Sequence, residues 1–206
     1  MAYLIAVIVG YLLGSIPFGF LMGKWKGIDL RKAGSGNIGA TNALRVLGKP
    51  AGSAVLALDA FKGALACWLT PFLVTTLVGD VVNGSTLAVI AGFSAVLGHN
   101  YTCWLRFKGG KGIATSAGVL LALTPGGLAI ALSTFLILLG ITRTVSIGSI
   151  GAAAILPFGT WASGGQGGLL VITAVMGVLA IYKHKGNILR LLAGTEPRIG
   201  QKKTES

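Results

Sequence analysis

The chain has 206 residues, of which 53% are hydrophobic and only 11% are charged. Its mean hydropathy of +0.82 excludes an ordinary soluble domain of this size and indicates that a bilayer is its main solvent. A net charge of +12 would favour nucleic-acid binding in a soluble protein, but here it is explained by cations at the membrane surface, so no nucleic-acid partner is expected.

Seven apolar segments follow one another along the chain, separated by short polar breaks. A helix needs roughly 20 apolar residues to cross a hydrocarbon core. We therefore expect an all-α, polytopic integral membrane protein with about seven transmembrane helices; five is the alternative. No cations precede the first segment, so we expect it to be retained rather than cleaved as a signal peptide. The expected spans lie at about residues 1–23, 51–78, 85–105, 112–124, 127–142, 145–163 and 168–182.

The breaks between these spans are alternately basic and free of cations. No lysine or arginine occurs near Asp80, at residues 124–127 or at residues 163–168. Since cytoplasmic loops carry the excess of cations, the N-terminus is expected outside and the C-terminus in the cytoplasm. Residues 1–206 are expected to form a single membrane-embedded domain with a polar, loosely ordered tail from about residue 195. The cations of the remaining segments are Lys24, Lys26, Arg31, Lys32, Arg45, Lys49, Arg106, Lys108, Lys111, Arg143, Lys183, Lys185, Arg190, Arg198, Lys202 and Lys203.

The first basic loop is rich in glycine and small polar residues. Arg45 follows Thr41 by one helical turn, and a helix is expected to begin behind the glycines. Such a loop can present backbone N–H groups, hydroxyls and amides to one small anion, so it predicts a phosphate site; a flexible connector is the alternative. It is not a Walker A loop, which ends in Gly-Lys-Ser or Gly-Lys-Thr. The run reads Gly34-Ser35-Gly36-Asn37-Ile38-Gly39-Ala40-Thr41-Asn42.

The third loop places two lysines around two glycines, at the start of a predicted helix. Lysine contributes a point charge, and glycine lets the backbone come close to an anion. The alternative is that Lys108 and Lys111 only fix the topology and extend toward the interface. The run reads Phe107-Lys108-Gly109-Gly110-Lys111-Gly112-Ile113-Ala114-Thr115.

The last cytoplasmic segment contains one of the two histidines. If it is helical, His184, Asn187 and Arg190 lie on neighbouring positions. His99, near the inner end of the third span, is expected to be structural, whereas His184 stands among cations beside an asparagine and is the better candidate for chemistry.

Acidic residues are scarce, and two charges fall inside an apolar span. Asp59 and Lys62 are expected to form a structural ion pair, because charges inside a membrane must be compensated. Carboxylates do not cluster, and no Cys/His grouping predicts zinc, so neither a metal site nor a cofactor is expected. Cys67 and Cys103 are taken as small buried hydrophobic residues.

At these loops the sequence closely resembles the bacterial acyl-phosphate:glycerol-3-phosphate acyltransferases, the PlsY-type family, over nearly its whole length. The resemblance also includes the pairs Gly98-His99 and Gly194-x-Glu196. The three ordered motifs that carry it are Ser35-Gly36-Asn37-x-Gly39-Ala40-Thr41-Asn42-x-x-Arg45, Lys108-Gly109-Gly110-Lys111-Gly112-x-Ala114-Thr115 and His184-x-x-Asn187-Ile188. Further matches are Ser15-Ile16-Pro17 and Leu58-Asp59-x-x-Lys62-Gly63.

The resemblance implies transfer of a fatty acyl group from a long-chain acyl phosphate to the 1-hydroxyl of glycerol-3-phosphate, which gives lysophosphatidic acid and inorganic phosphate in phospholipid synthesis. It also implies contact with membrane lipid, functional coupling to the enzyme that makes acyl phosphate, and a multi-pass location in the bacterial cytoplasmic (inner) membrane with the active site facing the cytoplasm. Acyl phosphate is an activated mixed anhydride, which fits the lack of an evident Ser-His-Asp set.

The resemblance further implies residue roles. A clamp for the phosphate of glycerol-3-phosphate is expected from Ser35, Arg45, Lys111, His184 and Asn187, while Asn37, Gly39 and Thr41 address the acyl phosphate or the reacting hydroxyl. A serine of the segment Arg143-x-x-Ser146-x-x-Ser149 is expected to line the glycerol pocket. The base is either a substrate phosphate oxygen or His184. The predicted catalytic residues are Ser35, Asn37, Thr41 and His184, and the predicted substrate-binding residues are Gly36, Gly39, Arg45, Lys108, Lys111, Ser149 and Asn187.

Three other functions can be weighed against the sequence, and one of them, a pure scaffold protein, would leave the three motifs without a purpose. A histidine followed four residues later by aspartate is absent, because Cys103 follows His99 and Ile188 follows His184 at that spacing, and this disfavours the acyltransfer chemistry that uses such a pair. A small membrane transporter of a phosphorylated or anionic metabolite would also use basic glycine loops, but it predicts cations on both membrane faces. The cations here lie on the expected cytoplasmic side.

Overall fold

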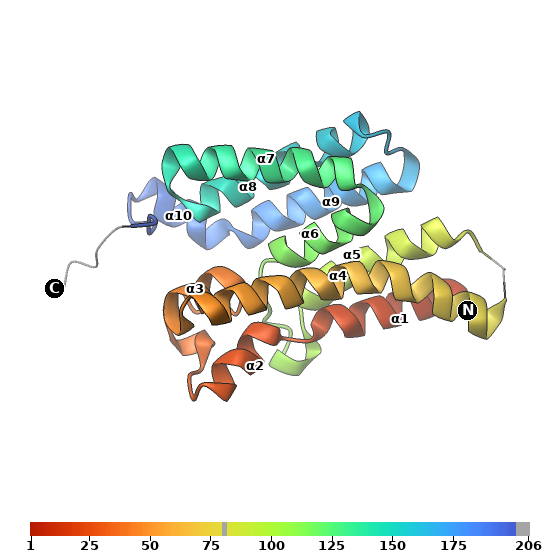
Figure 1. Cartoon of the computed structure of the whole chain (residues 1–206), viewed down its shortest axis with the longest axis horizontal. Coiled ribbons are helices and arrows are strands. Elements are labelled where there is room, and N and C mark those ends of the chain that lie inside the picture. Colours follow the sequence, from red (N-terminus) through yellow and green to blue (C-terminus); the bar gives the residue numbers. More distant parts are fainter. Residues whose placement is uncertain (80–81, 201–206) are drawn as a thin grey trace. The chain divides into compact units, whose positions relative to one another are not determined.

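The computed structural model describes residues 1–79 and 82–200, and the regular elements among them are all helices (Figure 1). The contacts within the chain define two compact units, Met1–Pro125 and Gly126–Ser206. The expectation of an all-α chain is confirmed for the described residues, while the expectation of one membrane-embedded domain stays a prediction.

The first unit packs its helices through small residues. It contains α1 (Ala2–Ser15), α2 (Phe18–Trp25), α3 (Ala40–Leu47), α4 (Lys49–Val78), α5 (Gly84–Asn100) and α6 (Ile113–Leu123), with two short 3-10 helices, η1 (Leu30–Lys32) and η2 (Cys103–Leu105). A Cβ atom built on Gly14 would lie 2.0 Å from the Ala95 carbonyl oxygen, and one built on Gly118 would lie 1.8 Å from that of Ala60. Glycine therefore lets α1 approach α5, and α6 approach α4, closely enough for backbone contact.

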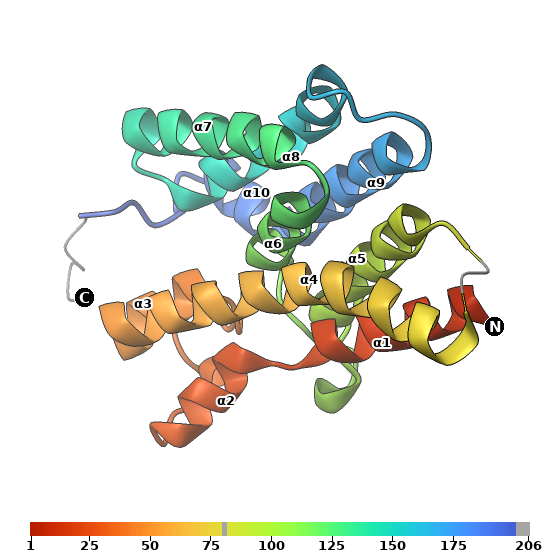
Figure 2. The same ribbon diagram turned by 45° about the vertical axis from the view of Figure 1, so that its right-hand side comes forward.

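The first predicted span is not one continuous helix. A proline at position 17 has no N–H to donate and separates α1 from α2, a break that Figure 2 shows. The carbonyl oxygen of Ser15 there accepts a hydrogen bond from the Thr102 hydroxyl at 2.6 Å, and the Ser15 hydroxyl accepts one from the Trp104 indole N–H at 3.0 Å. The segment after α5 thus satisfies backbone groups at the break.

The second unit contains α7 (Pro125–Thr142, beginning at the last residue of the first unit), α8 (Val145–Ala162), α9 (Gly167–Lys183) and α10 (Lys185–Leu192). Helices α8 and α9 pack together where a Cβ on Gly177 would lie 2.5 Å from the Ala153 carbonyl oxygen. The chain bends by 53° between α9 and α10. His184 lies at that bend, as the C-cap of α9 and the N-cap of α10.

The described helices confirm a membrane protein but not the predicted number of crossings. Large apolar side chains such as Trp68, Phe72 and Leu77 are exposed on α4, as expected for a helix that faces lipid. Four described stretches are long and apolar enough to cross a bilayer, namely Ala2–Trp25, α4, α7 and α8, and counting α9 with α10 as one bent span gives five. The predicted third span extends too far, since α5 ends at Asn100. Seven crossings and the orientation stay predictions.

Candidate active site

The glycine-rich loop before α3 is organised by one buried asparagine. The Asn42 side chain donates from Nδ2 to the carbonyl oxygens of Leu30, Ala33 and Asn37 at 3.2, 3.0 and 2.8 Å. Its Oδ1 accepts from the Ser35 N–H at 2.9 Å. A single side chain therefore fixes the loop at four points, which makes a flexible connector the wrong reading of this segment.

Positive backbone φ angles let the loop wrap around this amide. The φ angles are +59° at Gly34 and +72° at Gly36, in the left-handed region that favours glycine. A Cβ on Gly34 would also lie 2.3 Å from the Asn42 Oδ1 atom. The tight turn and the close approach to Asn42 both explain why glycine occupies position 34.

Three backbone N–H groups that the sequence offered as anion ligands are used inside the loop. The Ser35 N–H donates to Asn42, the Gly36 N–H to the Ala33 carbonyl, and the Gly39 N–H to the Asn37 side-chain oxygen at 2.8 Å. These three N–H groups are therefore occupied within the loop, and the anion site itself stays a prediction. The N–H groups of Asn42 and Ala43 in the first turn of α3 donate to the Gly39 carbonyl at 3.1 Å, and the helix expected behind the glycines begins at Ala40.

The side chains around this loop point outward. Ser35, Thr41 and Arg45 are exposed, and the structure records no hydrogen bond from their side chains within the described part of the chain. Asn37 is half-buried, and its Oδ1 is held by Gly39. Ser35 lies in the loop before α3 and Thr41 in the first turn of α3, whereas Arg45 lies in the last turn of this short helix. The arrangement leaves two hydroxyls near the helix N-terminus and one guanidinium further along the same helix, which are groups that suit a phosphate.

The loop from Lys108 to Gly112 lies against the end of α5. The Gly109 and Gly110 N–H groups donate to the carbonyl oxygens of Asn100 and His99 at 3.2 and 3.0 Å. A Cβ on Gly109 would lie 2.0 Å from the His99 carbonyl oxygen, and one on Gly110 would lie 2.1 Å from the His99 Nε2 atom. The two glycines are therefore needed for this close contact. Lys108 is exposed and Lys111 is half-buried on either side of it.

Beneath this loop lies a buried cluster of charges. The Lys62 ammonium is 2.7 Å from the Asp59 carboxylate, and the His99 Nδ1 atom is 3.4 Å from the same oxygen. The Lys62 Nζ atom also donates to the Ile16 carbonyl at the break between α1 and α2, at 2.7 Å. The predicted structural ion pair is confirmed, and its connection to His99 and to the helix break was missed.

In the second unit the predicted residues surround the bend between α9 and α10. His184 is buried, and its Nδ1 atom is 2.8 Å from the Ala180 carbonyl oxygen. Because a carbonyl only accepts hydrogen bonds, this contact places a proton on Nδ1. Asn187 is also buried, and α10 confirms the helix expected to bring His184, Asn187 and Arg190 to neighbouring positions.

Glu196, which was not among the predicted site residues, connects three polar side chains of this region. Glu196 accepts hydrogen bonds from Asn187 at 2.6 Å, from Ser146 at 2.7 Å and from Arg190 at 2.7 Å. Burial alone would raise the pKa of Glu196, but the hydrogen bonds from Asn187, Ser146 and Arg190 together lower it below its ordinary value. The matched Gly194-x-Glu196 pair was the signal in the sequence.

Two further expectations for this unit stay predictions. The Ser149 hydroxyl donates within α8 to the Val145 carbonyl at 2.9 Å, and the Ser146 hydroxyl donates to Glu196, so each serine of that segment already has an acceptor. A loosely ordered tail is expected from about residue 195; its described part includes Glu196, with the partners given above, and the Ile199 N–H, which donates to the Arg143 carbonyl at 2.8 Å. Residues 201–206 of the tail lie outside the described residues.

Known proteins match this chain over nearly its whole length. The family model described as glycerol-3-phosphate acyltransferase matches residues 4–194. A glycerol-3-phosphate acyltransferase of Synechococcus sp. (strain JA-3-3Ab) is 48% identical, over 100% of this chain and 98% of that protein. The protein of the same name from Desulforamulus reducens is 48% identical, over 97% of each chain.

Solved structures give the same result. The crystal structure of PlsY, an integral membrane glycerol 3-phosphate acyltransferase, in its glycerol 3-phosphate form is 39% identical, covers 97% of this chain and 96% of its own, and superposes with a TM-score of 0.85. Its lysophosphatidic acid form is 37% identical, with the same coverage and a TM-score of 0.81. The chain therefore belongs to the glycerol-3-phosphate acyltransferase family.

Proposed function

We propose that this chain transfers a fatty acyl group from an acyl phosphate to the 1-hydroxyl of glycerol-3-phosphate, releasing lysophosphatidic acid and inorganic phosphate. The hydroxyl oxygen forms a bond to the acyl carbon, and the bond from that carbon to the phosphate oxygen breaks. The hydroxyl proton passes to a phosphate oxygen or to His184. Because the mixed anhydride is already activated, the protein mainly has to position two phosphate-bearing substrates and stabilise the oxyanion.

The observation that carries this proposal is the exposed set formed by Ser35, in the loop that Asn42 organises, and by Thr41 and Arg45, in the first and last turns of α3. Two hydroxyls and a guanidinium can donate several hydrogen bonds to one phosphate, and the planar guanidinium can do so in pairs. The printed descriptions of the relatives support it, since they name a glycerol-3-phosphate acyltransferase with a glycerol 3-phosphate form and a lysophosphatidic acid form.

The remaining residues are assigned to two tasks. Gly36 and Gly39 shape the loop, and the bond from the Gly39 N–H to the Asn37 oxygen leaves the Asn37 amide nitrogen to face the acyl phosphate. Lys108 and Lys111 supply charge from the second loop. His184 and Asn187 are assigned to the phosphate of glycerol-3-phosphate, and the Glu196 carboxylate positions the Asn187 amide.

The proposed topology has seven crossings, with the N-terminus outside and the active site facing the cytoplasm of a bacterial inner membrane. The alternation of basic and uncharged breaks supports it. It is tested with single cysteines at Gly84, Gly168 and Lys49 in a chain lacking Cys67 and Cys103. Gly168 is chosen because a Cβ there meets no atom within 4 Å. An impermeant reagent on intact cells should label positions 84 and 168 only, and labelling at position 49 would overturn the orientation.

The proposed partners follow from the reaction. Acyl phosphate reaches the site from the membrane surface, so contact with membrane lipid and functional coupling to the enzyme that makes acyl phosphate are part of the proposal. No metal or organic cofactor is required, because the anhydride supplies the driving force. Activity should therefore survive EDTA, whereas a loss that added metal reverses would contradict this point.

The activity is tested with the purified protein in lipid, given glycerol-3-phosphate and one donor at a time: acyl phosphate, acyl-CoA or acyl carrier protein. Lysophosphatidate and phosphate should appear in equal amounts with acyl phosphate alone. The control is Lys26→Gln, which removes one exposed charge outside the proposed site. Transport of glycerol-3-phosphate into vesicles without product formation would favour the alternative, a transporter of a phosphorylated or anionic metabolite.

A further inference from the structure

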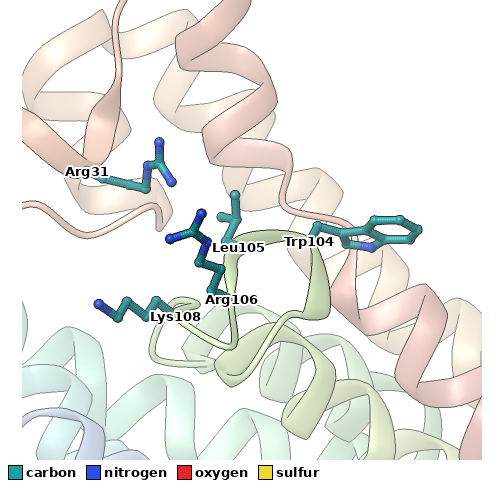
Figure 3. A pocket seen from close by; sticks show the side chains of 5 residues that line it. All are labelled: Arg31, Trp104, Leu105, Arg106 and Lys108. Carbon is teal, nitrogen blue, oxygen red and sulfur yellow. The ribbon is translucent and has the colours of Figure 1, made fainter.

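A cationic cavity lies in the first unit, between η1 and the turn after η2. Its volume is about 420 Å³, and it is lined by Arg31, Trp104, Leu105, Arg106 and Lys108 (Figure 3). Figure 3 shows the guanidinium groups of Arg31 and Arg106 directed toward one another, with Lys108 nearby and Trp104 turned away. Only Lys108 of these residues belongs to the predicted substrate site.

The charges around the cavity are only partly compensated. Arg31 forms a two-point ion pair with Asp29, with distances of 2.9 and 2.7 Å, and this hydrogen bonding lowers the pKa of Asp29 to about 2. Asp29 is therefore ionised at neutral pH and offsets Arg31. The structure records no ion pair for Arg106 or Lys108 within residues 1–79 and 82–200, so the cavity keeps two positive charges that an anion can neutralise.

The turn that carries Arg106 has an unusual backbone. Arg106 and Phe107 are consecutive non-glycine residues with φ angles of +53° and +59°. The hydrogen bond from the Phe107 N–H to the Thr102 carbonyl at 2.9 Å and that from the Lys108 N–H to the Leu105 carbonyl at 3.1 Å hold them there. A positive φ angle is unfavourable for residues that carry a Cβ atom, and such backbone strain is concentrated at binding sites. Here it accompanies the placement of Arg106 and Lys108 around one cavity.

The surroundings of the cavity indicate where its ligand comes from. The Trp104 ring is 64% exposed while its indole N–H is bound to Ser15, and Phe107 is 62% exposed. Exposed aromatic rings with an anchored polar end are typical of the boundary between headgroups and acyl chains. An amphiphile could place its phosphate among the cations and its chains along these rings. Dissolved phosphate would use only the cations.

We propose that this cavity binds the phosphate of a membrane amphiphile, a phospholipid or lysophospholipid headgroup, with Arg106 as the main ligand. The site is separate from the exposed set at Ser35, Thr41 and Arg45, none of which lines the cavity. It would hold a lipid phosphate beside the loop that begins at Lys108. The proposal does not depend on which acyl donor the protein uses.

The test measures lipid binding to the purified, delipidated full chain in detergent by native mass spectrometry. Arg106→Asn is the main variant, because asparagine tolerates a positive φ and so removes the charge without new strain. Lys24→Asn is the control, since Lys24 is exposed on α2 and does not line the cavity. The ligands are phosphatidylglycerol, lysophosphatidate, diacylglycerol and inorganic phosphate.

Arg106→Asn should weaken binding of phosphatidylglycerol about tenfold, Arg106→Lys should restore part of it, and the control should stay within about twofold. Lysophosphatidate should lose a smaller part of its binding, because as the product of the proposed reaction it also binds the substrate site. Diacylglycerol should bind poorly to every variant. Equal lipid affinity of Arg106→Asn and the parent chain would overturn the site. If inorganic phosphate binds as tightly as phosphatidylglycerol, the ligand is not a lipid. If diacylglycerol binds as tightly as phosphatidylglycerol, the phosphate is not what the cavity recognises.

Discussion

Asp59 in the first unit and Glu196 in the second each contact several polar side chains, but the two carboxylates differ in their surroundings. Asp59 lies within a long apolar helix, and it and Lys62 are both only 2% exposed. Glu196 follows the last helix and is 8% exposed, and its partner Arg190 is 40% exposed. If Glu196 is lost, water can therefore hydrogen-bond to its partners in part. If Asp59 is lost, the Lys62 ammonium stays buried without a compensating charge.

The comparison separates residues that hold the structure from residues left for ligands. Lys62, His99 and Arg190 contact a carboxylate within their own unit. The Arg45 guanidinium has no carboxylate partner among the described residues. Arg45 is therefore the cation whose loss should affect substrate most and fold least.

Removing Asp59 should have the largest effect on stability. Asp59→Asn leaves the Lys62 charge buried without its partner, and we expect the free energy of unfolding to fall by about 3–5 kcal/mol. The double variant Asp59→Asn/Lys62→Met should recover part of this loss, because it removes both charges. Unfolding midpoints in lipid discs measure both. A double variant no more stable than the single variant would contradict the idea that the unpaired charge causes the loss.

Glu196→Gln should cost less and depend on pH. The variant loses charge-assisted hydrogen bonds, so we expect a loss of about 1–3 kcal/mol at pH 7. Because the pKa of Glu196 is lowered in the folded protein, its stabilising effect is present above the ordinary glutamate pKa and disappears as the pH falls through the folded value. The difference between parent and variant in thermal unfolding should shrink below about pH 4. A difference that grows on acidification would show the opposite sign.

His184→Gln tests whether the histidine beside the bend is a donor or a base. Because the Nδ1–H faces the Ala180 carbonyl, His184 can donate to phosphate only from Nε2 of a doubly protonated ring. If it only donates in this way, the variant keeps most of kcat and its KM for glycerol-3-phosphate rises several-fold, and this is the result we expect. A general base would instead lower kcat by roughly 10²–10⁴. A variant that binds glycerol-3-phosphate normally but turns over a thousandfold more slowly would assign the base to His184.

Hydropathy could predict most of the fold but not its interruptions. The seven apolar segments are helical, because long apolar runs must satisfy their backbone hydrogen bonds internally. The end of α5 could not be placed, since the turn after Asn100 is itself apolar at Cys103, Trp104 and Leu105. Its shape is set by hydrogen bonds to the helix break near Pro17, and hydropathy does not report these.

The sequence predicted the residue types of the candidate site better than their individual contacts. Glycines, hydroxyls and an arginine indicated an anion loop, but not that Asn42 would be buried as its organiser while Asn37 stays half-exposed. Glu196 was missed because its partners are up to 50 residues away in the sequence. Such contacts depend on tertiary packing and leave no periodic pattern.

The most direct test of the account is the kinetics of Arg45→Ala with acyl phosphate as donor. A residue that binds the glycerol-3-phosphate phosphate equally in the ground and transition states should affect KM alone. We expect KM for glycerol-3-phosphate to rise tenfold or more, kcat to change by less than about threefold, and Arg45→Lys to restore only part. An unchanged KM, or an equal loss from the exposed control Lys26→Gln, would contradict the assignment of this loop to substrate phosphate.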